Sequence, residues 1–334
     1  MNKKDQIFKR HWKRIVILIL FIVLLIASLF MGILEGVTIQ ALVEGDEIVR
    51  RIFIHSRLPR TMAVVLTGSG LSVAGLIMQA ISRNKFMSPS TAGTTDAAIL
   101  GLLIAFIFLG NQSGMVQTIF AFFFALFATT VFTGIISRLK IRETVYIPLL
   151  GMMYGGMIAA LTTAIAFSFD ALNMLNQFNR ANFARIGGFR MIFIIVIPLV
   201  LAVIFATKFS IIGLGEDFSK NLGVNYNRVV MLGLFLVALI STVVLVTVGP
   251  LPFVGLIIPN IVTSFYGDNL KKSIFDLMLF GSVFVLICDI ISQLIIFPFE
   301  MDVSLTVSLA GGIIFMIYLV RRMRGGGTHK QAKV

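Results

Sequence analysis

The side chains of this sequence that could do chemistry are few and widely spaced. The single cysteine, Cys288, lies in an apolar run, so neither an intrachain disulfide nor a thiolate metal cluster can form. The three histidines (His11, His55 and His329) are far apart and give no metal-ligand spacing. No Gly-x-x-x-x-Gly-Lys-Ser/Thr segment occurs, so the sequence contains no phosphate-binding loop for ATP. We therefore predict that the chain is not an enzyme and binds no metal or cofactor.

Two carboxylates, Asp96 and Asp289, stand in apolar surroundings. Acids inside a membrane are costly and often mark proton or ion relays. Alternatively, each is bonded to its neighbours, because each has hydroxyl or amide side chains within four residues. We expect no His, Lys or Arg inside a span to pair with them, which disfavours a proton-driven carrier. The structural role is favoured, and both roles stay open.

Composition indicates a membrane protein with many spans. Of the 334 residues, 58% are hydrophobic and 13% are charged, against ~25% charged in soluble domains. A spanning helix uses roughly 20 apolar residues, so this content would fill about nine or ten spans. Hydropathy predicts an all-α polytopic protein with about ten transmembrane helices, at 15–34, 61–82, 93–109, 115–137, 145–168, 191–208, 229–249, 252–266, 273–297 and 303–320.

Positive charge predicts the orientation. The net charge is +13, and Lys and Arg are concentrated in both terminal segments and in alternate loops. Because basic loops stay in the cytoplasm, we predict one multi-pass domain (1–334) in the inner or plasma membrane, with cytoplasmic tails at 1–14 and 321–334. Membrane lipid is the expected surrounding. No basic stretch is interleaved with aromatic residues, so nucleic acid is not an expected partner.

Two segments cannot be regular membrane helices. Residues 83–89 are polar, and Pro250, Pro252 and Pro259 interrupt the eighth span. Irregular backbone at membrane depth is tolerated only where protein or a water-filled path covers it. Both segments should therefore lie inside the bundle. Small residues between Gly68 and Gly75 predict close helix packing.

The inner loop 208–228 is the most informative loop. Its pattern predicts a short helix from Glu216 to Leu222, a break at Gly223 and a second helix that begins at Asn225. The apolar side chains on the short helix would suit a groove on a partner protein. A helix lying on the lipid surface is the alternative, and the residues do not decide between the two.

At this loop the sequence resembles the coupling-loop signature of iron-siderophore and vitamin B12 ABC importer permeases, the FecCD/vitamin B12-type family. The resemblance covers nearly all of the chain, in the family's order. It rests on Gly215-Glu216-Asp217, Asn221-Leu222-Gly223-Val224 and Arg228, on Arg57-Leu58-Pro59-Arg60, Gly68, Gly75, Gln79, Arg83-Asn84, Ser88-Pro89 and Gly93, and on Gly249-Pro250-Leu251-Pro252, Pro259, Asp289 and Glu300. The departures are Lys85, Asn260, Gln293 and Met301, where the family usually has Pro, His, Arg and Pro.

The resemblance implies a type II ABC importer permease fold and a half-transporter. Two copies, or one copy and a sister permease, would enclose a path. Two cytoplasmic ATPase subunits, which use the ATP, would dock on the coupling loop, and an extracytoplasmic binding protein would deliver the cargo to outward-facing Arg57 and Arg60. A ferric siderophore is the expected cargo; heme and cobalamin are alternatives, and a proton-coupled secondary carrier is the alternative from another class. The residues implied for coupling are Gly215, Glu216, Asp217, Leu222, Gly223 and Arg228.

Five weakly polar residues are candidates for the translocation path, because a large chelate needs a wide lining that does not bind it tightly. They are Ser72, Gln79, Thr162, Thr163 and Asn260. The alternative for each is helix packing or a hydrogen bond within its own helix.

Overall fold

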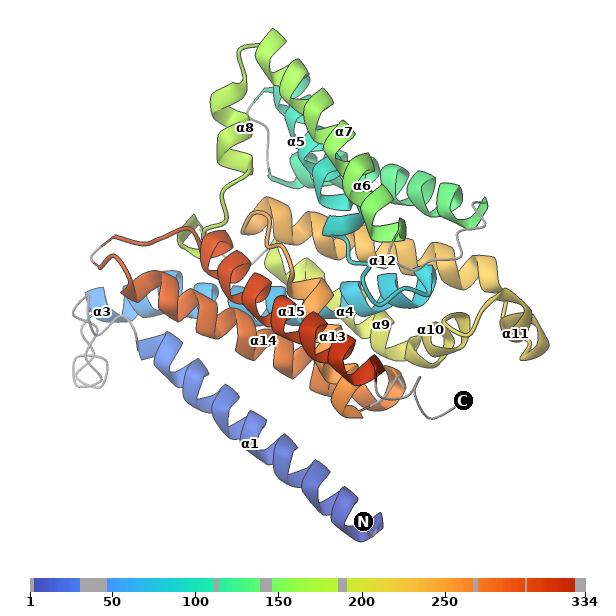
Figure 1. Ribbon diagram of the computed structural model, residues 1–334. Coiled ribbons are helices and arrows are strands. Elements are labelled where there is room, and N and C mark those ends of the chain that lie inside the picture. The colour runs from blue at the N-terminus through green and yellow to red at the C-terminus, as the bar shows by residue number, and fades with distance from the viewer. Residues whose placement is uncertain are drawn as a thin grey trace.

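The structure, a computed structural model, describes residues 3–30, 47–110, 114–138, 146–185, 191–266, 270–297 and 299–327. Within these ranges all regular secondary structure is helical (Figure 1). The elements are α1 (Lys3–Phe30), α3 (Glu47–Ile52), η2 (Phe53–Arg57), α4 (Leu58–Ser82), η3 (Ser90–Ala92), α5 (Thr94–Leu109), α6 (Gly114–Arg138), α7 (Tyr146–Ser168), α8 (Leu172–Phe178), η4 (Phe183–Arg185), η5 (Ile192–Ile195), α9 (Val196–Ile204), α10 (Ala206–Ile212), α11 (Glu216–Asn221), α12 (Tyr226–Thr247), α13 (Val254–Tyr266), α14 (Leu270–Leu294) and α15 (Val303–Gly327).

The apolar helices match the ten predicted spans in place. Among the described residues, six helices are long and apolar enough to cross a membrane: those that contain α4, α6, α7, α12, α14 and α15. A seventh candidate is the pair Ile192–Ile204 and Ala206–Ile212, which is bent by 64°. Three shorter apolar helices, at Arg14–Leu29, Thr94–Leu109 and Val254–Phe265, fill the remaining predicted positions.

The two terminal helices are longer than predicted. Helix α1 begins at Lys3 and α15 ends at Gly327, so both extend into the segments predicted as tails, 1–14 and 321–334. Lys and Arg are good helix formers, and a helix therefore need not end where its apolar run ends. Residues 1–2 and 328–334 of those tails lie outside the described residues.

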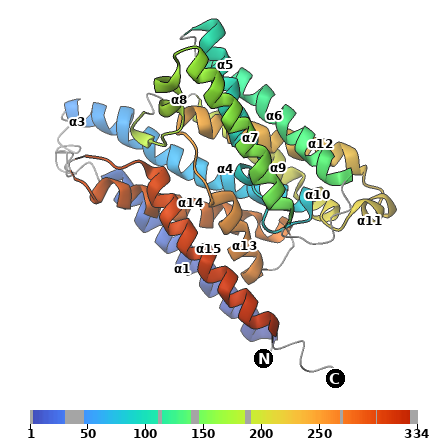
Figure 2. The same cartoon turned by 45° about the horizontal axis from the view of Figure 1, so that its top comes forward.

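Helix α4 forms the centre of the bundle. Most of its surface is buried, chiefly against α14, α12 and α13. Two glycines allow this approach: a Cβ on Gly68 would overlap the backbone of Gly281 in α14, and a Cβ on Gly75 would overlap that of Gly255 in α13. Figure 2 shows α1 beside α14 on one side of this group and α5, α6 and α7 together on the other. These contacts confirm the close helix packing predicted from the small residues between Gly68 and Gly75.

The two irregular segments lie inside the bundle, as predicted. After α4 the chain turns at Arg83, whose φ of 49° is left-handed, and Asn84 and Ser88 are buried. Before α13, Gly249 and Phe253 both have positive φ, and Pro250 and Pro252 occupy the connection to α12. Pro259 lies inside α13. These two segments meet where Pro89, Pro250 and Gly255 share one small cavity.

Candidate functional site

A compact helix–glycine–helix unit stands at one end of the bundle, opposite α3 (Figure 1). Gly215 (φ 115°) precedes α11, and Gly223 (φ 72°) follows it in the left-handed region that favours glycine. Asn225 then caps α12, because its Oδ1 accepts a hydrogen bond from the Arg228 amide at 3.1 Å. The predicted helix, break and second helix are therefore confirmed.

Internal hydrogen bonds hold this unit in shape. The Ser219 hydroxyl is buried and donates to the carbonyl of Gly215 at 2.7 Å, and the Val224 amide donates to the carbonyl of Ser219 at 2.9 Å. On the outside, Lys220 Nζ lies 2.9 Å from the Glu216 carboxylate, which raises the pKa of that amine. The unit is a preformed projection.

Three large apolar side chains of this projection are exposed. Leu214, Phe218 and Leu222 keep 61%, 64% and 59% of their surfaces uncovered. Phe218 and Leu222 are four residues apart and lie on one side of α11, and Leu214 lies in the turn that leads into Gly215. Asp217 and Arg228 are also exposed. Such an apolar stripe with charged neighbours is the surface that a helix lays into a partner's groove. Leu214 lies in the turn before α11, so the helical pattern predicted from the sequence did not include it.

A buried ionic network occupies the other end, where α4 begins. Arg60 Nη2 lies 2.9 Å from Asp289 Oδ1, and Arg60 Nη1 donates to Glu300 Oε1 at 2.6 Å. Arg57 Nη1 donates to Gln293 Oε1 at 3.1 Å, and Gln293 Nε2 donates to Asp289 Oδ2 at 2.8 Å. One chain of contacts thus joins the first turn of α4, the end of α14 and the segment before α15.

This network bears on two expectations. Arg57 and Arg60, the residues predicted to receive a binding protein, are 4% and 5% exposed in the single chain, and docking at them stays a prediction. No basic residue was expected to pair with Asp289 inside the bundle, and this expectation is wrong, because Nε and Nη2 of Arg60 donate to the two carboxylate oxygens of Asp289. The reason is that a fully buried carboxylate is stable only with a charged or hydrogen-bonding partner, and the nearest one comes from α4.

The five path candidates do not form one lining within the chain. Gln79 and Asn260 come together, because the side-chain amides of both donate to the Leu256 carbonyl. Ser72 is fully buried where α4 crosses α14, and its hydroxyl donates to the Gly68 carbonyl. Two more lie apart on α7, where the hydroxyls of Thr162 and Thr163 donate to carbonyls of their own helix.

Asp96 lies in the first turn of α5, against Gly155 of α7. An acid in this position interacts favourably with the positive end of the helix dipole. The neighbouring Thr94 hydroxyl pairs instead with Thr129 at 2.7 Å. The structure therefore provides a helix-terminal role for Asp96, and within the described residues no group of three or more His, Cys, Asp or Glu side chains could hold a metal.

Comparison with known proteins finds relatives that match most of this chain. The sequence is 42% identical to the petrobactin import system permease protein YclN of Bacillus subtilis over 91% of this chain and 96% of that protein. It is 38% identical to the ferric-anguibactin transport system permease protein FatD of Vibrio anguillarum over 80% and 86%. A solved structure of an inward-facing metal-chelate type ABC transporter superposes with a TM-score of 0.74 at 19% identity, over 92% of this chain and 97% of that one, which confirms the expected fold. The model of the FecCD transport family matches residues 15–322, and the chain therefore belongs to that family.

Proposed function

We propose that this chain is the membrane-spanning permease subunit of an ATP-driven importer that moves iron–siderophore complexes inward. The observation that carries the proposal is the preformed projection around α11, with Leu214, Phe218 and Leu222 exposed at one end of a membrane bundle. The sequence has no ATP-binding loop, so the energy for transport would come from a partner protein that binds this projection. The siderophore cargo is inferred from relatives whose names specify petrobactin and ferric anguibactin.

The proposed assembly has two permease chains, identical or sister subunits, and two ATPase subunits. The ATPases would bind at the α11 end, which is then cytoplasmic, as are both termini. An extracytoplasmic binding protein would dock at the opposite end, where Arg57 and Arg60 begin α4. Because these arginines are held by Asp289, Gln293 and Glu300, docking would proceed by exchange of carboxylates around Arg60. The chelate would pass between the two permease chains.

The test is a reconstituted transporter in vesicles, assayed for uptake of a radioactive ferric siderophore. Leu222→Asp places a carboxylate in the apolar stripe and should abolish ATP-driven uptake while the permease still inserts. Asn221→Asp, next to it on the exposed side of α11, adds the same charge outside the stripe and is the matched control. Equal uptake by both variants would contradict the coupling role. Glu216→Arg tests the charged edge of the projection in the same assay.

The same vesicles separate the alternatives. Uptake of heme or cobalamin instead of the ferric chelate would keep the assembly and change the cargo. Uptake that continues without ATP hydrolysis and stops when the proton gradient collapses would identify a secondary carrier. The buried pairing of Asp289 with Arg60 disfavours a carrier that uses Asp289, because its charge is already neutralised within the chain.

A further inference from the structure

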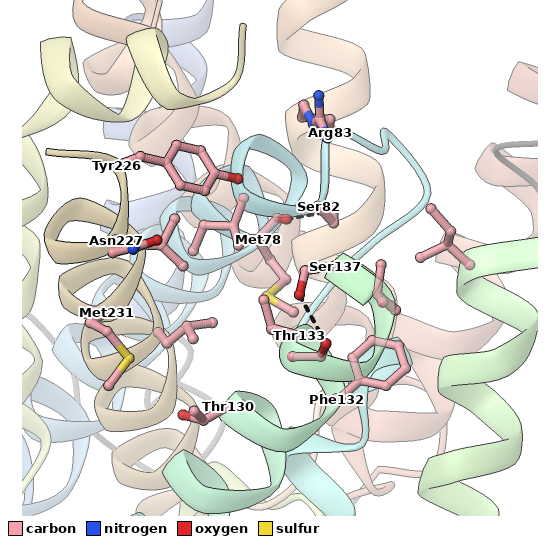
Figure 3. Close-up of a pocket in the computed structure, with 16 residues that line it drawn as sticks. Met78, Ser82, Arg83, Thr130, Phe132, Thr133, Ser137, Tyr226, Asn227 and Met231 are labelled. Carbon is pink, nitrogen blue, oxygen red and sulfur yellow. Dashed lines mark hydrogen bonds between the residues drawn. The ribbon is translucent and has the colours of Figure 1, made fainter. Parts of the chain in front are cut away.

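A recess of about 420 Å³ opens beside the coupling projection, between the ends of four helices (Figure 3). Its size falls within the ~300–1,000 Å³ of ligand sites in proteins. The side chains that line it come from the end of α4, the end of α6, the start of α7 and the start of α12. They include Met78, Ser82, Arg83, Gly134, Tyr226 and Leu234.

The lining is amphipathic along the helices. Its polar members lie mainly at helix ends: Ser82 is the last residue of α4, and Tyr226 and Asn227 are the first two of α12. In Figure 3, Arg83 stands at the rim and the Tyr226 hydroxyl points across the mouth toward the end of α4. The deeper lining is largely apolar, as in Met78 and Leu234. A ligand that fits must be apolar at one end and polar at the other.

The polar end is suited to an anion. Arg83 is exposed at the rim and is the charged residue of the lining. Arg138 and Arg228 directly follow the lining residues Ser137 and Asn227 in sequence. Deeper in the wall, the Thr133 hydroxyl is buried and has no hydrogen-bond partner in the described part of the chain. The recess therefore offers positive charge at its mouth and an unused hydroxyl in its wall.

We propose that this recess is a binding site for one anionic phospholipid, whose phosphate lies near Arg83 and whose acyl chain lies between α6 and α12. Basic pockets between membrane helices on the cytoplasmic side bind such headgroups. The leaflet rests on the orientation given by the proposed function; the lipid chemistry does not. Arg83 also lies beside the projection around α11. Its Nη1 is 3.1 Å from the position that a Cβ would take on Gly215, the residue before α11. A bound headgroup would thus stabilise the junction between α4 and α11.

The test is native mass spectrometry of the purified permease after equilibration with dioleoyl phosphatidylglycerol or dioleoyl phosphatidylcholine. One Arg near an anionic headgroup is worth about a fivefold preference, so phosphatidylglycerol should be retained about fivefold more. Gly134→Phe fills the recess without a backbone clash, since nothing lies within 4 Å of a Cβ there, and should remove the retained lipid. Ile135→Phe, on the next residue of α6 and outside the lining, is the control and should retain it.

Arg83→Asn separates charge from shape, because asparagine tolerates the left-handed φ of this position. This variant should abolish the preference for phosphatidylglycerol and leave the total amount of retained lipid unchanged. If Gly134→Phe fails to fold, Arg83→Asn alone tests the proposed site. Equal retention of both lipids by the unchanged permease, or full retention by Gly134→Phe, would overturn the proposal. Displacement by glycerol phosphate alone would show a site for a free anion, and a protein found in the recess would show an interface. Binding is read without ATPase or cargo, so its failure is distinct from failure of uptake.

Discussion

Arg60 and Asp289 form an ion pair inside the permease, with Nη2 and Oδ1 2.9 Å apart and no surface of Asp289 exposed. The pair joins the first turn of α4 to the end of α14, two helices that pack extensively against each other. Glu300 completes the partners of Arg60 but keeps 27% of its side chain exposed. One partner is therefore structural and fixed, and the other is accessible from outside the helix pair.

Removal of the buried charge should be strongly destabilising. Asp289→Asn keeps the shape of the side chain but leaves Arg60 with Glu300 as its remaining carboxylate, and breaking such a pair costs about 3–5 kcal/mol. We expect the lower part of this range in thermal unfolding of the solubilised permease. The control is Asp170→Asn, an exposed position with φ of 53° that asparagine accepts, which should shift stability by less than ~0.5 kcal/mol. Equal shifts would show that the pair contributes nothing.

The accessible partner gives a test of docking. If carboxylates of a binding protein compete with Glu300 for Arg60, then Glu300→Gln should strengthen association, by up to about fivefold for an exposed charge. The gain should shrink as salt is added, since charges are screened over ~8 Å at physiological ionic strength. Surface plasmon resonance with the binding protein measures both effects, and Asp302→Asn in the same segment is the control. Reversal of Arg57 and Arg60 to Glu should weaken association; an unchanged affinity in that variant would exclude docking here.

The sequence alone predicted the spans and the projection around α11, because both depend on the local pattern of residues. A run of about 20 apolar residues identifies a span wherever it occurs, and a glycine between two helical patterns identifies a break. The Arg60–Asp289 pair was not predictable in this way. Its residues are 229 positions apart, and a single sequence contains no information on distance at that separation. Arginines at the start of a membrane helix usually face headgroups, so the burial of Arg57 had no local signal.

The break at Gly223 should be required for coupling through its backbone alone. A Cβ there would meet nothing within 4 Å, but φ is 72°, and a non-glycine residue pays about 1–2 kcal/mol in that region. Gly223→Val should therefore reorient the projection and lower ligand-stimulated ATP hydrolysis, while Gly223→Asn should retain most of it. Loss of hydrolysis in both variants would mean that the glycine contacts the ATPase directly.

The close crossing of α4 and α13 should tolerate no added atom. A Cβ on Gly75 would overlap the Gly255 carbonyl, a backbone group that cannot relieve the clash by rotating as a side chain could. Gly75→Ala should therefore lower the free energy of unfolding by about 1–3 kcal/mol, because it overpacks the core at this position. Gly134→Ala has open space and should be neutral or gain up to ~1 kcal/mol from helix propensity. Thermal unfolding of the two alanine variants side by side measures the difference, and similar midpoints would show that the crossing can widen.

The path prediction is best tested at Thr163, because Ser72 is fully buried and a Trp there would disrupt the crossing of α4 and α14 rather than block a path. Thr163 is the exposed member of the five candidates, and the single native cysteine, Cys288, is buried and should react little. In the assembled transporter, Thr163→Cys should react with a charged thiol reagent, and the reaction should stop uptake. Leu161→Cys, two residues away on the opposite side of α7 and also exposed, should be protected by lipid. If Leu161→Cys reacts and Thr163→Cys does not, the path lies on the other face of α7, and Thr163 is excluded from its lining.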